Sequence, residues 1–152
     1  MEEQVITYQI NGRERTFHAR NADTMLYVLR EKLGLTGAKP GCLNGDCGAC
    51  TIEVDGKVMK SCLMLAIEGH QKKITTIEGL HQTPIQEQFI ENFAFQCGYC
   101  SPGFIMNCHA LVNQLPNASD SDIKEWLESN MCRCTGYKEM EEAVKATIKK
   151  MQ

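Results

Sequence analysis

The sequence predicts an α+β protein in which a small sheet-forming unit is followed by a bundle of four helices. In the first half, apolar and polar residues alternate, and two turn dipeptides, Asn11-Gly12 and Asp55-Gly56, separate segments of this kind. In the second half, apolar residues recur every three or four positions, which is the period of a helix packed on one side. A chain of 152 residues is long enough for two such units, each with a thin core.

The composition is typical of a soluble globular protein, with 43% apolar and 23% charged residues. The formal net charge of −3 excludes a general basic surface for nucleic acid, and no apolar run approaches the roughly 18 residues of a membrane span. The chain has nine cysteines but opens with no basic segment followed by an apolar run. We therefore expect neither secretion nor a disulfide framework, and a cytoplasmic location.

The first element is a predicted hairpin of residues 5–10 and 15–19. Ile6, Tyr8 and Ile10 share one face at period two, and Asn11-Gly12 supplies the turn. A helix is predicted next, over residues 21–37. Asp23 is its expected N-cap, Gly34 its expected end, and its apolar stripe consists of Leu26, Leu29 and Leu33.

Residues 51–62 predict a second hairpin that turns at Asp55-Gly56, with Cys62 at the far end of its return strand. A short strand over 72–78 completes an α+β unit of about 75 residues. Residues 79–84 contain Gly and Pro without periodicity, which favours a linker.

Four helices are predicted beyond the linker. The first, over 84–95, has Ile85, Phe89 and Phe93 on one face. The second begins with Ser101 as N-cap and Pro102 at N1, has Cys108 as a core thiol, and stops at Pro116. Ser119 and Asp122 form a capping box for the third. The apolar face of the fourth consists of Met140, Ala143, Val144 and Ile148.

Residues 40–62 contain four cysteines at the spacing C-x4-C-x2-C-x11-C, which is that of a plant-type ferredoxin loop holding one two-iron, two-sulfur cluster. Such a cluster has four outward iron valences, and each thiolate fills one. Glycines in the loop permit positive φ and leave room for backbone N–H groups to turn toward the cluster. The cysteines are Cys42, Cys47, Cys50 and Cys62, and the glycines are Gly41, Gly45 and Gly48.

A second group of cysteines lies in the helical half, as Cys97-x2-Cys100 and Cys132-x-Cys134. Each pair falls in a connection between predicted helices, so two loops at one end of the bundle can close on one metal centre. Four thiolates also satisfy tetrahedral zinc. The spacing alone leaves an iron–sulfur centre and a zinc site both open.

Four segments together resemble the small iron–sulfur subunit of the molybdenum hydroxylases, the family that includes xanthine dehydrogenase, carbon monoxide dehydrogenase and aldehyde oxidoreductases. The segments are GCLNGDCGACT, SCLMLAIEG, QCGYCSPG and NMCRCTGY. The resemblance covers nearly the whole chain. It implies a β-grasp ferredoxin domain at 1–78 and, after the linker 79–84, a four-helix domain at 85–152, with one 2Fe-2S cluster in each.

The resemblance also implies roles for individual residues. Gln96 and Cys134 match residues that approach the molybdopterin cofactor of a large subunit. Ser101, Ser129 and Asn44 depart from common residues of the family, but none of these changes removes a ligand. The implied ligands of the first cluster are Cys42, Cys47, Cys50 and Cys62, and those of the second are Cys97, Cys100, Cys132 and Cys134.

The function expected from this resemblance is electron transfer within an oxidoreductase complex. The chain is expected to have no catalytic residues of its own and to relay single electrons from the molybdopterin centre through both clusters to a flavin subunit. The expected partners are a large molybdopterin-binding subunit and a medium FAD-binding subunit, in a dimer of heterotrimers. Purines and other N-heterocycles are the favoured substrates, while aldehydes and carbon monoxide stay open. The alternatives are a free diffusible ferredoxin and a zinc-stabilised scaffold.

Overall fold

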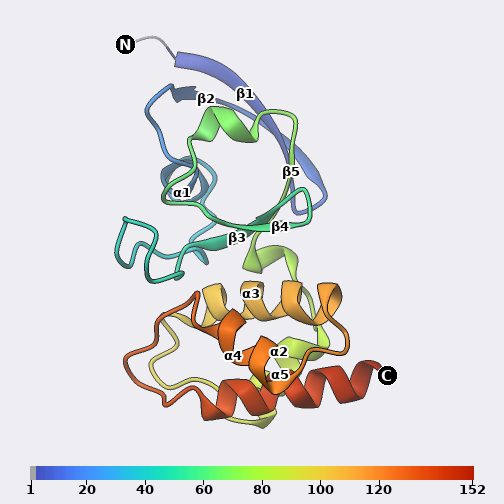
Figure 1. Ribbon diagram of the computed structural model, residues 1–152. Coiled ribbons are helices and arrows are strands. Elements are labelled where there is room, and N and C mark those ends of the chain that lie inside the picture. The colour runs from blue at the N-terminus through green and yellow to red at the C-terminus, as the bar shows by residue number, and fades with distance from the viewer. Residues whose placement is uncertain (1–2) are drawn as a thin grey trace.

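Five strands form one mixed sheet in the first half of the computed structural model, which describes residues 3–152 (Figure 1). The strands are β1 (Glu3–Ile10), β2 (Arg13–Arg20), β3 (Thr51–Val54), β4 (Lys57–Lys60) and β5 (Lys73–Thr75). Their order across the sheet is β2-β1-β5-β3-β4. Strand β5 runs parallel to β1 and antiparallel to β3, so the last strand along the chain lies in the centre and joins the two hairpins.

Both predicted hairpins are confirmed. Ile10 pairs with Arg13 across the first turn, and Val54 pairs with Lys57 across the second. All four turn residues have positive φ, from 48° to 81°, as a two-residue hairpin turn requires. The first turn is also tied to the end of β5, because the Asn11 side chain hydrogen-bonds the backbone N–H and the hydroxyl of Thr76.

The predicted helix over 21–37 is shorter than expected and its cap is different. Helix α1 (Met25–Tyr27) continues into the π-helical turn η1 (Val28–Lys32), and Gly34 follows it with a φ of 70°. Thr24, not Asp23, is the N-cap, and its side chain accepts from the N–H of Tyr27. Asp23 is instead buried and pairs with Arg20, which holds the chain as it leaves β2.

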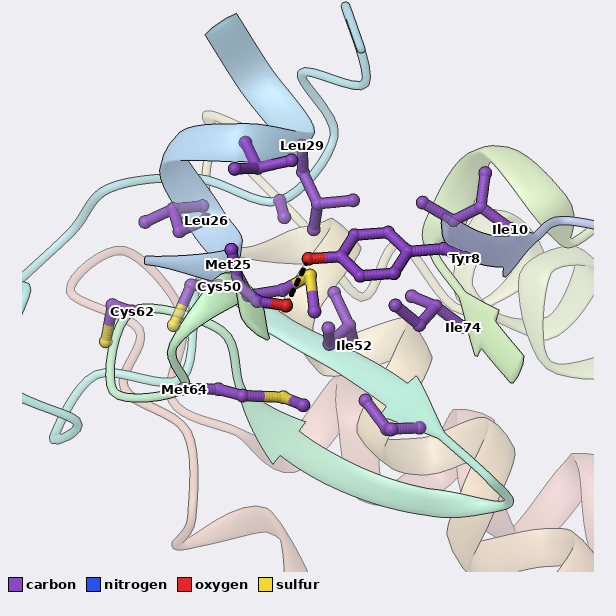
Figure 2. Close-up of a cluster of buried hydrophobic side chains, with 14 of the residues drawn as sticks. Tyr8, Ile10, Met25, Leu26, Leu29, Cys50, Ile52, Cys62, Met64 and Ile74 are labelled. Atoms are coloured by element: carbon purple, nitrogen blue, oxygen red, sulfur yellow. Dashed lines mark hydrogen bonds between the residues drawn. The ribbon is translucent and has the colours of Figure 1, made fainter. Parts of the chain in front are cut away.

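The core of the first half packs between the sheet and α1 (Figure 2). Tyr8 is fully buried, and its hydroxyl donates to the carbonyl of Ala66 at 2.5 Å. Ala66 is the first residue of η2 (Ala66–Gly69), a short 3-10 turn. Cys50 and Cys62 belong to the same core, so two candidate ligands are anchored by apolar packing.

The second half contains the helices α2 (Pro84–Glu91), α3 (Ser101–Gln114), α4 (Asp120–Leu127) and α5 (Lys138–Met151). A 3-10 turn, η3 (Ile77–Gly79), precedes them, and α2 begins inside the segment predicted as a linker. The capping box of Ser119 and Asp122 is confirmed, and Cys108 is a fully buried core thiol as predicted. This half has its own core, built from Ile85, Phe89, Phe104, Leu111, Ile123, Met140 and Val144 together with smaller residues.

Two predicted details of these helices are wrong. Phe93 does not extend the apolar face of α2, because the helix ends at Glu91 and Phe93 takes a φ of 52° with 79% of its surface exposed. Ser101 is the first residue of α3 and not its cap, since Cys100 is already helical in φ and ψ and its carbonyl accepts from Phe104. Helix α3 therefore begins directly after the candidate ligand Cys100.

The two halves pack directly on one another, with α3 lying against β3 and β4 (Figure 1). They approach closely at Gly103 of α3, where an added Cβ would overlap the carbonyl oxygen of Gly48. Among residues 3–152, the structure has no helix long and apolar enough to cross a membrane.

Candidate functional site

Three loops that contain seven of the nine cysteines lie on one side of the molecule. They are the loop of residues 40–50, which leads into β3, and the connections before α3 and α5 (Figure 1). Contacts join them: the hydroxyl of Tyr99 donates to the carbonyl of Pro40 at 3.0 Å, and the N–H of Met131 donates to the carbonyl of Cys47 at 2.9 Å.

The four cysteines of the first group form two pairs. Cys42 interacts side chain to side chain with Cys47, and Cys50 with Cys62. The hairpin explains the second pair, because Cys50 directly precedes β3 and Cys62 follows β4, so the β3–β4 pairing brings their ends together. Cys42 and Cys47 are half-buried, while Cys50 and Cys62 are buried.

Backbone N–H groups converge on the outer pair. The N–H of Cys47 lies 3.3 Å from the Sγ of Cys42, and the N–H of Cys42 lies 3.3 Å from the Sγ of Cys47. The bond from the Cys47 N–H, with a further one from Asn44, lowers the pKa of Cys42 to about 7, which favours the thiolate that binds metal. Burial instead raises the pKa of Cys62 to about 11, so this thiol keeps its proton until a metal displaces it.

The second group forms two pairs in the same manner. Cys97 interacts with Cys134, and Cys100 with Cys132, so each pair joins one residue from each connection. Burial raises the pKa of Cys100 to about 12. Cys97 and Cys134 are exposed, whereas Cys100 and Cys132 are half-buried. The second group therefore has one pair at the surface and one pair beneath it.

Thiols arranged as two pairs fit a two-iron cluster, because each iron takes two of the four thiolates. Glycine at position 41 leaves room for a candidate ligand, since a Cβ added there would stand 2.5 Å from the Cys47 Sγ. Beside the second group, the hydroxyl of Ser101 is buried without a hydrogen-bond partner.

Segment 129–131 connects the two groups of cysteines. The side-chain amide of Asn130, which is buried, donates to the carbonyl of Gly48 at 2.9 Å. The Nζ of Lys60 donates to the carbonyl of Ser129 at 2.6 Å. Together with the bond from Met131 to Cys47, these contacts fix the first loop against the residues that precede Cys132.

Sequence reasoning missed these connecting residues. Lys60 lies in the alternating strand KVMK, where a lysine indicates only a solvent-facing position, and no short-range pattern pairs Asn130 with Gly48. The one available signal was an asparagine two residues before a cysteine motif. Gln96 and Cys134, singled out from the sequence, are both exposed in the structure.

Comparison with known proteins places both groups of cysteines in recognised domains. Residues 8–75 match the family model described as the 2Fe-2S iron-sulfur cluster binding domain, and residues 76–145 match that of the 2Fe-2S binding domain. The chain is therefore composed of two domains of 2Fe-2S-binding families.

Relatives match over nearly the whole chain. The nicotine 6-hydroxylase small subunit of Paenarthrobacter nicotinovorans is 42% identical, with 91% of this chain and 86% of the relative covered. The nicotinate dehydrogenase small FeS subunit of Eubacterium barkeri is 37% identical, with 95% of each covered. In the crystal structure of quinoline 2-oxidoreductase from Pseudomonas putida 86, one chain matches with a TM-score of 0.93 and 36% identity, over 98% of this chain and 96% of that one.

Proposed function

Because this chain belongs to the small iron–sulfur subunits of the molybdenum hydroxylase family, we propose that it relays electrons one at a time from a molybdopterin centre in a large partner, through two 2Fe-2S clusters, toward a flavin subunit. The chain itself is an electron-transfer component of an oxidoreductase complex. The observation that supports the relay best is the presence of two separate sets of paired thiols that are linked by direct contacts.

We assign the ligands by these pairs. Cys42 and Cys47 hold one iron of the first cluster, and Cys50 and Cys62 hold the other. In the second cluster, the pairs are Cys97 with Cys134 and Cys100 with Cys132. Each cluster, when bound, takes up and releases one electron.

The residues around the clusters have three tasks in this proposal. The N–H groups of the first loop stabilise negative charge on sulfur. The buried positions of Cys50 and Cys62 exclude water from the inner side of the first cluster. The hydrogen bond from Met131 to Cys47 provides a short bonded route between the residue before Cys132 and a ligand of the first cluster.

We propose that electrons enter at the surface formed by Gln96 and Cys134. Both residues are exposed, and Cys134 belongs to the exposed pair of the second group. A cofactor of the large subunit can reach the second cluster there without crossing the core of this chain. The first cluster is linked to the second through segment 129–131. In this proposal it faces the flavin subunit.

The substrate class proposed for the complex is an N-heterocycle. The names of the three relatives above contain nicotine, nicotinate and quinoline, and each of these compounds has an aromatic ring that contains nitrogen. A medium FAD-binding subunit, assembly as a dimer of heterotrimers and a cytoplasmic location belong to the same proposal. So does the division of the chain into a ferredoxin domain at 1–78, a linker at 79–84 and a helical domain at 85–152, which follows the change from sheet to helices.

Metal analysis of the protein purified with its partners tests this function. The proposal requires about four iron atoms and four acid-labile sulfides per chain and two distinct paramagnetic signals after reduction. A colourless chain with stoichiometric zinc would refute it in favour of a scaffold. Recovery of the fully loaded chain only as a free monomer, even from cells that contain the other subunits, would instead favour a diffusible ferredoxin.

A further inference from the structure

Lys60 is a half-buried cation between the two halves of the molecule. It ends β4, pairs with Thr51 directly after Cys50, and precedes Cys62 by two residues. Its Nζ donates to the carbonyl of Ser129 and lies 2.7 Å from the point where a Cβ on Gly48 would stand. The ammonium group is therefore held against the loop of the first group by the β4 backbone on one side and by Ser129 on the other.

No carboxylate of residues 3–152 forms an ion pair with this charge. Among the ion pairs in the described part of the chain, none includes Lys60. Lys60 lies beside two members of the first group, because it pairs with Thr51, the residue after Cys50, and precedes Cys62 by two residues. Its contact with the segment of the second group is indirect, through the carbonyl of Ser129, three residues before Cys132.

A fixed positive charge has a predictable effect on a redox centre. Reduction adds one negative charge to a cluster, and a cation within several ångströms stabilises that charge by Coulomb attraction, which is stronger in a partly buried site than in water. A cation close to one of two clusters changes the difference between their potentials. That difference decides on which cluster a single electron resides.

We propose that Lys60 directs electron flow within this chain by raising the reduction potential of the first cluster relative to that of the second. The inference rests on the proposed function, in which both clusters are present. In the step concerned, one electron leaves the second cluster, which is oxidised, and enters the first, which is reduced, and no bond forms or breaks. Lys60 takes no part in the transfer itself. Its charge changes which cluster holds the electron.

Four variants of the complex purified with its partners separate this role from a structural one. Lys60→Gln keeps a hydrogen-bond donor but removes the charge, Lys60→Met removes both, and Lys60→Arg keeps the charge. Lys57→Gln is the matched control, because Lys57 begins the same strand and is exposed. The readout is a redox titration in which the two clusters are followed separately by electron paramagnetic resonance.

We expect both uncharged Lys60 variants to disfavour reduction of the first cluster about tenfold at a fixed applied potential, a downward shift of about 59 mV for one electron, with the second cluster unchanged. Lys60→Arg and Lys57→Gln are expected to titrate as the unmodified protein does. An unchanged first cluster in Lys60→Gln, or equal shifts of both clusters, would overturn the proposal. Failure of the proposed function has a different signature, namely that the unmodified protein lacks two separate signals.

Discussion

Substitution of Gly103 by alanine tests whether the two halves need their close contact. Gly103 is buried in α3, and the added Cβ would overlap the carbonyl oxygen of Gly48 and lie 3.0 Å from the Cα of Ala49. Both obstacles are backbone atoms, so neither can rotate away. The halves must therefore move apart, which strains the two hydrogen bonds that the first loop accepts from Asn130 and Met131.

The magnitude follows from three contributions. Overpacking costs about 2 kcal/mol, and weakening two hydrogen bonds costs about 1 kcal/mol in total. Alanine is the better helix former by about 1 kcal/mol, which offsets part of the loss. The net destabilisation of about 2 kcal/mol corresponds to a fall of about 4–8 °C in the unfolding temperature of a chain of this size.

Thermal unfolding followed by circular dichroism measures this change. The magnetic interaction between the two reduced clusters reports on the contact between the two halves. Gly136→Ala is the matched control, because no atom lies within 4 Å of its added Cβ. We expect the interaction to weaken in Gly103→Ala and to persist in the control. Equal unfolding temperatures and equal spectra for the two variants would refute the reasoning that this contact holds the halves together.

Three further predictions concern single sites. Cys47→Ser is expected to abolish the signal of the first cluster and Cys100→Ser that of the second, since each residue belongs to a different set of pairs; loss of both signals in either variant would contradict the ligand assignment. Burial acts to raise the pKa of Asp23, but its hydrogen bonds and ion pair with Arg20 prevail and lower it, so the stabilisation is complete above the ordinary carboxyl pKa and disappears as pH falls through the lowered value. Asp23→Asn should thus unfold about 5 °C earlier than the unmodified chain at pH 7 and lose this difference as the pH falls through the lowered pKa of Asp23, and a constant difference would argue against the ion pair. Phe93→Gly should unfold a few degrees later, because it relieves a positive φ and removes an exposed aromatic ring; an earlier transition would show that the ring stabilises the chain.

The parts of the fold that were predictable depend on local chemistry. The two hairpins follow from Asn11-Gly12 and Asp55-Gly56, whose positive φ values need no tertiary contact to explain them. The capping box of Ser119 and Asp122 is equally local. The first group of cysteines was recognisable because its members lie within a single loop and hairpin.

The features that could not be predicted depend on competition between neighbouring residues or on contacts between distant segments. Phe93 has the right spacing for the apolar face of α2, but the helix ends before reaching it. Asp23 resembles a helix cap, yet the adjacent Thr24 serves as the cap while Asp23 binds Arg20. The position of Lys60 against Ser129 joins residues 69 positions apart, and no periodicity contains that information.

The central position of β5 has a consequence for how the protein is made. Strands β1 and β3 do not pair with each other, and each reaches the other only through β5. The ribosome must therefore release the chain beyond Thr75 before the two hairpins can share one sheet, although all four cysteines of the first group have emerged by then. Until that moment the hairpin flanked by Cys50 and Cys62 lacks its neighbouring strand, so we expect iron to be taken up after the domain has closed and not during its synthesis.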